Sequence, residues 1–323
     1  MHKLIKFIKY PIAIALLYFL FTSGRIELSV LADFLNARNA MITMAVFIIW
    51  IAHDVVFSLR YQFVLDALGY KAKLIDIFNA TMVGIFSNNF VPGGAGIDIA
   101  RIYYLKKSDN VPISGGMAVA VLDRSLGFCG LVLVSAILLP LMLAITQVDT
   151  TFLATLKILF IALVALAIVL LSGIVVLRLD VSYSFIQRLF ARWTFTSRAL
   201  PFISAMHLLV LNNRVMLASI SYSMVGRMLT IASAALLTYS LYGTKAAYAM
   251  IAMHGIMQLL IAIPITPANI GWTELVSDEL LHLFGTDGGA NIAIVGRVMA
   301  VLYSLIGGVI YLRLKGNNRT GLM

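Results

Sequence analysis

Long apolar segments dominate this sequence and restrict it to a fold that can exist in a lipid bilayer. In the bilayer core each backbone polar group must be paired within the protein, which leaves helices and closed barrels. Of the 323 residues, 61% are hydrophobic and 12% are charged, whereas a soluble domain is about 45–50% apolar. The alternating ten-residue pattern of an outer-membrane barrel is absent. The sequence therefore predicts an all-α polytopic membrane protein.

Six segments have the length of a full transmembrane helix, about 20 residues. They are 4–23, 40–59, 114–144, 153–177, 215–242 and 290–312. Lys3, Lys6 and Lys9 stand at the start of the first of these. No convincing cleavage site follows it, so we expect a retained helix rather than a signal peptide.

Two further apolar regions, 75–105 and 246–284, are interrupted by turns rich in proline and glycine. Pro92 and Pro267 stand in these turns. The arm 97–105 would be about 14 Å long as a helix, too short for a core of about 30 Å. We therefore expect each region to form a re-entrant helical hairpin, with its proline at the tip.

The net charge of +10 reflects basic residues at the ends of the apolar segments. Such clustering is typical of orientation signals, so nucleic acid is not an expected partner. With both hairpins returning to their own side, most Lys and Arg fall on the cytoplasmic side. This predicts a protein of the cytoplasmic membrane with both termini in the cytoplasm. The basic connection 178–214 is expected to carry an interfacial helix around 185–193.

The two halves of the chain, 1–147 and 148–323, resemble each other weakly. Each contains two spans, a hairpin and a further span. Similar residues recur at matching places: Pro92 and Pro267, Gly96 and Gly271, Asp98 and Glu274, Arg124 and Arg297. An odd number of crossings per half turns the second half upside down. Inverted repeats with broken helices are typical of alternating-access transporters.

Charged residues lie inside the apolar regions, where each one costs about 2.5–3.5 kcal/mol on insertion scales. The arginines are Arg101, Arg124, Arg227 and Arg297, and the acids are Asp54, Asp98, Asp123 and Glu274. The guanidinium fork binds phosphate or carboxylate through two bonds. The four arginines are therefore candidate ligands for an anionic group within the bilayer.

The acids leave two interpretations open. Asp98 and Glu274 either compensate the dipole of a helix N-terminus or form a proton or charge relay with Asp123. Arg101 follows Asp98 by three residues and shares its helix face, whereas Asp123 and Arg124 are adjacent and cannot face each other. Arg227 and Arg297 have no nearby acid in sequence. They are the first candidates for a ligand phosphate, with interhelical salt bridges as the alternative.

At the hairpin tips, backbone N–H groups are candidates for binding an anion. Helices that restart after Gly96 and Gly271 would point their N-termini inward and offer N–H groups to an anion. Gly93 and Gly94 would let the backbone approach a ligand closely. Asn88, Asn89 and Asn269 flank the tips and either bind a head group or cap the broken helices. The alternative for each tip is a simple turn between buried half-helices.

No pattern in the sequence indicates a catalytic centre, a metal site or a cofactor. Cys129 stands alone in an apolar segment, which favours core packing. We expect His53 and Asp54 to form an interfacial pair near the end of the second span. His254 and Gln258, one helical turn apart, are expected to make interhelical contacts.

The tip motifs resemble the lysylphosphatidylglycerol synthase transmembrane-region family, the flippase-like membrane domain of the multiple peptide resistance factor. The matching residues are Pro92-Gly93-Gly94-Ala95-Gly96-Ile97-Asp98-Ile99-Ala100-Arg101, then Asp123-Arg124, then Pro267, Gly271 and Glu274. Ala268 and Asn269 replace two glycines of the family pattern at the second tip. The resemblance implies lipid handling across the membrane, and it does not imply synthase activity for this chain.

We therefore expect a transporter that moves a phosphate-bearing lipid or a lipid-linked saccharide between leaflets. One alternative is an integral-membrane transferase or hydrolase acting on a lipid-linked substrate. Another is a non-catalytic member of a lipid- or glycan-assembly complex. The sequence leaves open two kinds of protein partner, enzymes of lipid or glycan assembly and a second copy in a homodimer.

Overall fold

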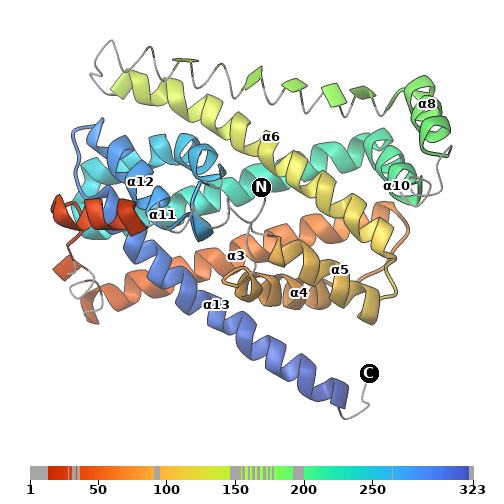
Figure 1. Cartoon of the computed structure of the whole chain (residues 1–323), viewed down its shortest axis with the longest axis horizontal. Helices are drawn as coiled ribbons and strands as arrows, with labels where there is room; N and C mark the ends of the chain where they lie inside the picture. The colour runs from red at the N-terminus through yellow and green to blue at the C-terminus, as the bar shows by residue number, and fades with distance from the viewer. Residues whose placement is uncertain are drawn as a thin grey trace.

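The computed structural model describes most of the chain as helices packed side by side (Figure 1). It describes residues 14–90 except 28, 31–33, 35 and 36, residues 95–145, scattered positions between 154 and 178, residues 179–191, and residues 200–319 except 264. The helices are α3 (Ala37–Ala67), α4 (Leu74–Ser87), α5 (Gly96–Ser108), α6 (Ile113–Ile145), α8 (Asp180–Ala191), α10 (Leu200–Leu211), α11 (Asn213–Ile261), η2 (Pro267–Asn269), α12 (Trp272–His282) and α13 (Gly289–Arg319). Within these residues there is no strand, so the predicted all-α class is confirmed.

Four helices of the described residues are long and apolar enough to cross a membrane. They cover Asn39–Ala67, Ile113–Leu138, Asn213–Ile261 and Gly289–Lys315. These match four of the predicted spans and support a multi-pass membrane protein. About half of each of the predicted spans 4–23 and 153–177 lies outside the described residues, although 14–22 is helical. The total of six spans therefore stays a prediction.

The helix α3 is longer than the predicted span 40–59. It continues to Ala67 because 61–67 contains no proline or glycine. The chain then turns at Gly69, which adopts a φ of 81° as glycine after a helix commonly does. Asp54 and Arg60 both lie inside this longer helix and are buried.

The first hairpin consists of α4 and α5, packed against each other along their length. Gly84 makes this possible, because a Cβ there would overlap the backbone of Ile97. The base of the hairpin lies at the C-terminal end of α3, where Gln62 Nε2 donates to the Ala72 carbonyl at 2.8 Å. A core cluster that includes Leu65, Ile77 and Leu105 fills this end of the bundle.

The second hairpin consists of the last part of α11 and α12. The helix α11 breaks at Gly243, whose φ of 78° and ψ of −168° are not helical. This break separates the predicted span 215–242 from the hairpin that begins at 246. At the base, Arg25 donates to Asp278 at 3.1 Å and to Glu279 at 2.5 Å. The bond to Glu279 raises the pKa of the Arg25 guanidinium, so this contact stays charged.

The two hairpins start from opposite ends of α3 and both reach α13. A second core cluster packs Phe34 and Val46, near the start of α3, against the second hairpin. At the tips, Asn89 donates to Ser304 at 2.8 Å and Arg297 donates to the Asn269 carbonyl at 3.1 Å. Ser304 and Arg297 are seven residues apart, or about 10 Å along the helix. The described parts of the tips thus meet the same helix near its middle.

Candidate functional site

A network of buried charged residues joins four helices at the centre of the bundle. Arg60 on α3 donates from Nε to Asp123 on α6 at 2.6 Å. Arg101 on α5 lies 3.7 Å from the other oxygen of Asp123 and donates to Thr81 on α4 at 2.9 Å. Both arginines are 3% exposed. The sequence analysis singled out Arg101 and Asp123 but missed Arg60, the closest partner of Asp123.

Aromatic rings and small residues hold this network in place. The Arg60 guanidinium lies 4.3 Å from the centre of the Phe57 ring, and that of Arg101 lies 4.6 Å from the Tyr61 ring. Such cation–π contacts favour a desolvated cation. A Cβ on Gly226 of α11 would come within 2.9 Å of Phe57, so this glycine lets α11 approach α3 closely.

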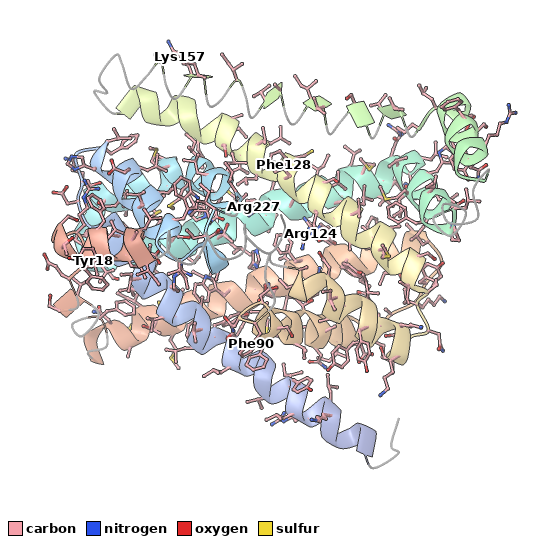
Figure 2. The ribbon with its side chains drawn as sticks, viewed as in Figure 1. Tyr18, Phe90, Arg124, Phe128, Lys157 and Arg227 are labelled. Carbon is pink, nitrogen blue, oxygen red and sulfur yellow. The ribbon has the colours of Figure 1, made fainter. Side chains whose placement is uncertain are left out.

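Arg227 on α11 borders the same network and lies near the middle of the molecule (Figure 2). Arg60 donates from Nη1 to Ser223 at 2.5 Å, and Ser223 is one helical turn before Arg227. The Nε atom of Arg227 is buried and has no hydrogen-bond partner among the described residues. Within these residues no carboxylate lies within 4 Å of it.

His254 adds a second buried nitrogen without a partner. It lies on the second arm of α11 and is 4% exposed. Its Nδ1 atom has no partner among the described residues, while its Nε2 atom lies 3.5 Å from Gln258. His254 and Gln258 therefore contact each other within α11, and their interhelical contacts stay a prediction.

The charges of this centre do not balance within the described residues. Arg60, Arg101 and Arg227 are three cations, and Asp123 is the one carboxylate in contact with any of them. An uncompensated buried charge costs several kcal/mol. The centre therefore carries an excess of positive charge, and the buried Nε atom of Arg227 beside it has no partner among the described residues.

Asp98 and Arg124 form a separate ion pair between α5 and α6. Arg124 Nε lies 2.5 Å from Asp98, and its side chain is 56% exposed. Asp98 therefore pairs with α6 and not with Arg101 three residues later on its own helix. As expected for adjacent residues, Asp123 and Arg124 point to different partners. Asp123 faces the buried network, and Arg124 faces the surface.

Arg297 is bound by the second tip. It donates to Glu274 at 2.7 Å, to the Ala268 carbonyl at 3.0 Å and to the Asn269 carbonyl at 3.1 Å. Of the two interpretations that the sequence left open, the structure shows the salt bridge. Glu274 is 1% exposed and also accepts from the Gly271 amide at 2.7 Å. This amide is thus occupied by the protein's own carboxylate.

The asparagines act as caps in this structure. Asn88 accepts from the Gly96 amide at 2.8 Å, and Asn269 donates to the Ile261 carbonyl at 2.7 Å. Asn89 donates to Ser304 and to the Phe86 carbonyl. Pro267 begins η2 at the second tip. Pro92, Gly93 and Gly94 lie outside the described residues, so nothing here bears on their predicted role.

A second cluster of polar side chains joins α3 to α13. The sequence analysis named two of its members, His53 and Asp54, but not Tyr303. Tyr303 donates to Asp54 at 2.6 Å, and His53 Nδ1 lies 2.9 Å from the same carboxyl group. The expected contact between His53 and Asp54 is present, and α3 continues beyond it to Ala67. Its position at the membrane interface stays a prediction. Only the spacing of His53 and Asp54 was visible in the sequence, since Tyr303 is 249 residues away.

Cys129 is buried, as expected for core packing. Among the described residues, no group of three or more His, Cys, Asp or Glu side chains is placed to hold a metal ion.

Comparisons with known proteins identify the family. A UPF0104 membrane protein from Methanocaldococcus jannaschii is 31% identical over 114 residues, which are 35% of this chain and 34% of the relative. The chain thus spans about a third of the length of this curated relative. No solved structure matches the chain. The family model described as lysylphosphatidylglycerol synthase TM region matches residues 8–308, as the tip motifs predict, and the chain belongs to this family.

Proposed function

We propose that this protein moves a phosphate-bearing lipid or a lipid-linked saccharide between the leaflets of the cytoplasmic membrane. The observation that carries the proposal is the excess of positive charge around Asp123. Arg60 and Arg101 share its carboxylate, and the buried Nε atom of Arg227 has no partner among the described residues. A phosphate group carries negative charge and several acceptor oxygens, so it would balance this centre.

Helix packing supports movement of the head group through the bundle. The hairpins enter from opposite ends of α3, and both contact α13 near its middle. In the proposed mechanism the halves 1–147 and 148–323 form an inverted repeat with six spans and two re-entrant hairpins. Rocking of the halves exposes the arginine centre to each leaflet in turn. The acyl or prenyl chains stay in the bilayer.

Two of the four arginines are already paired with carboxylates, which affects their role in this mechanism. Arg124 pairs with Asp98 at the surface, and Arg297 pairs with Glu274 at the second tip. A phosphate that approaches either arginine must compete with its carboxylate. We therefore assign first contact with the phosphate to Arg227, and we propose that the two paired arginines exchange partners during movement of the hairpins.

Translocation in proteoliposomes tests this function. A phosphatidylglycerol with a fluorescent label on its chain is bleached from outside, and the protected fraction is followed over time. One hydrogen bond to a charged group contributes about 1.5–3 kcal/mol, so Arg227→Gln should slow translocation at least about tenfold. Arg214→Gln, at the exposed start of α11, is the matched control and should leave the rate unchanged.

Two outcomes contradict the proposal. Equal translocation by the wild type and Arg227→Gln would remove the arginine centre from the mechanism. Mass spectrometry of the lipids after incubation covers the enzyme alternative, because a translocator leaves their covalent structure unchanged. A new lipid product that forms only with active protein would show that the protein is a transferase or hydrolase and not a transporter.

A further inference from the structure

A cavity of about 490 Å³ lies between the first hairpin and the C-terminal half of α13. It is lined by Val83 and Ser87 on α4, by Ile99, Tyr103 and Tyr104 on α5, and by Tyr311 and Lys315 on α13, together with Gly96 and Ala100. Cavities that hold small molecules in proteins measure about 300–1,000 Å³. The four arginines and Arg60 do not line it.

The cavity arises from the way α13 crosses the hairpin. The two elements approach closely at Gly307, because a Cβ there would overlap the carbonyl of Met82 on α4. Tyr311 and Lys315 follow at intervals of four residues and so lie on the same face of α13. Beyond this contact α13 leaves the bundle at an angle (Figure 1). The diverging helices leave the space that these side chains border.

The opposite faces of α5 separate this cavity from the arginine centre. Asp98 and Arg101 point toward α6, where they contact Arg124 and Asp123. Ile99 and Tyr103 lie on the other face and are 56% and 62% exposed. The cavity is thus open to the surroundings of the bundle, which are lipid for a protein that crosses the membrane.

The lining of the cavity combines two kinds of surface. Lys315 and the three tyrosines provide a cation and hydroxyl groups, and Val83, Ile99 and Ala100 provide an apolar surface. Tyrosine and lysine are the side chains that anchor proteins at the level of lipid head groups. Each kind of lining side chain matches one part of a phospholipid: the cation matches the phosphate, the hydroxyl groups match the glycerol, and the apolar side chains match an acyl chain.

We propose that this groove binds one anionic phospholipid of the surrounding leaflet, with its phosphate at Lys315 and its acyl chain along α4 and α5. A neighbouring cavity shares Tyr104 and is lined by Asp76 and Lys107, whose charges oppose each other. The lining of the groove itself contains Lys315 and no acidic residue, so we place the phosphate at Lys315. The proposal concerns binding alone and goes beyond translocation, since the groove and the arginine centre share no residue.

Photo-crosslinking at a groove residue tests the proposal. The photoreactive residue p-benzoylphenylalanine replaces Tyr103, and the protein is reconstituted in nanodiscs of phosphatidylcholine with phosphatidylglycerol. Captured lipid is identified by mass spectrometry. We expect enrichment of phosphatidylglycerol over its share in the nanodisc. The same residue at Tyr239, which is exposed on α11, should capture the lipids in the proportion supplied.

Two matched pairs of variants then locate the lipid. Lys315→Glu should reduce capture of phosphatidylglycerol at least about fivefold, while Arg313→Glu, at the same end of α13 but outside the cavity, should not. Ile99→Trp should fill the groove and reduce capture of both lipids. Val121→Trp, on the exposed face of α6, should have no effect.

Equal loss in Lys315→Glu and Arg313→Glu would mean that the charge of the helix end attracts lipid without a site, and would overturn the proposal. Unchanged capture in Ile99→Trp would do the same for the cavity. Arg227→Gln separates the two proposals. Slower translocation by this variant with full capture at Tyr103 supports both proposals. Full capture with no translocation by the wild type would support lipid binding in the groove and contradict the proposed function.

Discussion

Arg60 and Asp123 lie 63 residues apart in the chain, and the Arg60 Nε atom donates to Asp123 Oδ1 over 2.6 Å inside the bundle. This contact ties α3 to α6, and Arg101 adds α5 to it from 3.7 Å. The same carboxylate therefore serves two arginines. It joins helices, and it leaves an excess of positive charge that we assign to ligand binding.

Removing this carboxylate should destabilise the protein strongly. Asp123→Asn leaves Arg60 and Arg101 without a counter-charge in a buried position, and breaking a buried pair costs between about 3 and 5 kcal/mol. Asp98→Asn removes a comparable carboxylate whose partner Arg124 is 56% exposed, and exposed pairs contribute at most about 1 kcal/mol. Unfolding in detergent micelles by heat measures both variants. Equal loss of stability would show that the Asp123 site is solvated.

The turn of the second hairpin should depend on the shape of Arg297 as well as on its charge. Arg297→Lys keeps the charge, but one ammonium group cannot replace the bonds to Glu274, Ala268 and Asn269. Losing a bond to a charged group costs about 1.5–3 kcal/mol, so amide hydrogen exchange across 262–271 should rise roughly tenfold or more. Arg214→Lys is the control. Unchanged exchange in Arg297→Lys would argue that the turn holds without the guanidinium.

Two glycines of α13 should respond in opposite directions to the same substitution. A Cβ on Gly307 overlaps the Met82 carbonyl, whereas a Cβ on Gly296 reaches Leu237 at an ordinary 3.7 Å. Gly307→Ala should destabilise by about 1–3 kcal/mol through overpacking. Gly296→Ala should stabilise by up to about 1 kcal/mol, because alanine is the better helix former. Thermal unfolding distinguishes them, and stabilisation of both would exclude close contact between α13 and α4.

The bond from Tyr303 to Asp54 should contribute measurably to stability. Tyr303→Phe removes the hydroxyl group that donates at 2.6 Å, at a cost of about 1.5–3 kcal/mol. Tyr311→Phe, two turns later on α13 at the open groove, should change little because its side chain is partly exposed. The melting temperatures of the two variants provide the comparison, and a smaller effect at Tyr303 would contradict the contact.

Hydropathy predicted the helices well because their signal is local. The four candidate spans and the break at Gly243 appear where apolar length and small residues place them. The predicted end of the second span, at residue 59, was too early for a physical reason. Arg60 resembles a charge at a membrane surface, and only the position of Asp123 on another helix turns it into a buried residue.

The partners of the charged residues depend on tertiary structure and could not be predicted in the same way. Spacing indicated that Asp98 and Arg101 share a helix face, but α6 supplies a closer partner for each. Spacing also showed that Arg227 has no acid nearby in sequence, and the structure adds none among the described residues. Arg297 had the same signal, yet it pairs with Glu274 from a neighbouring helix.

Stabilisation by lipid tests the arginine centre most directly. A ligand that binds only the folded state raises the melting temperature as its concentration passes its Kd. The Lys315→Glu background removes the contribution of the groove, and a short-chain phosphatidylglycerol is compared with the diacylglycerol that lacks its phosphate. We predict that the phosphate-bearing lipid stabilises this protein, that the diacylglycerol does not, and that adding Arg227→Gln abolishes the difference. An equal rise with and without Arg227 would contradict the account.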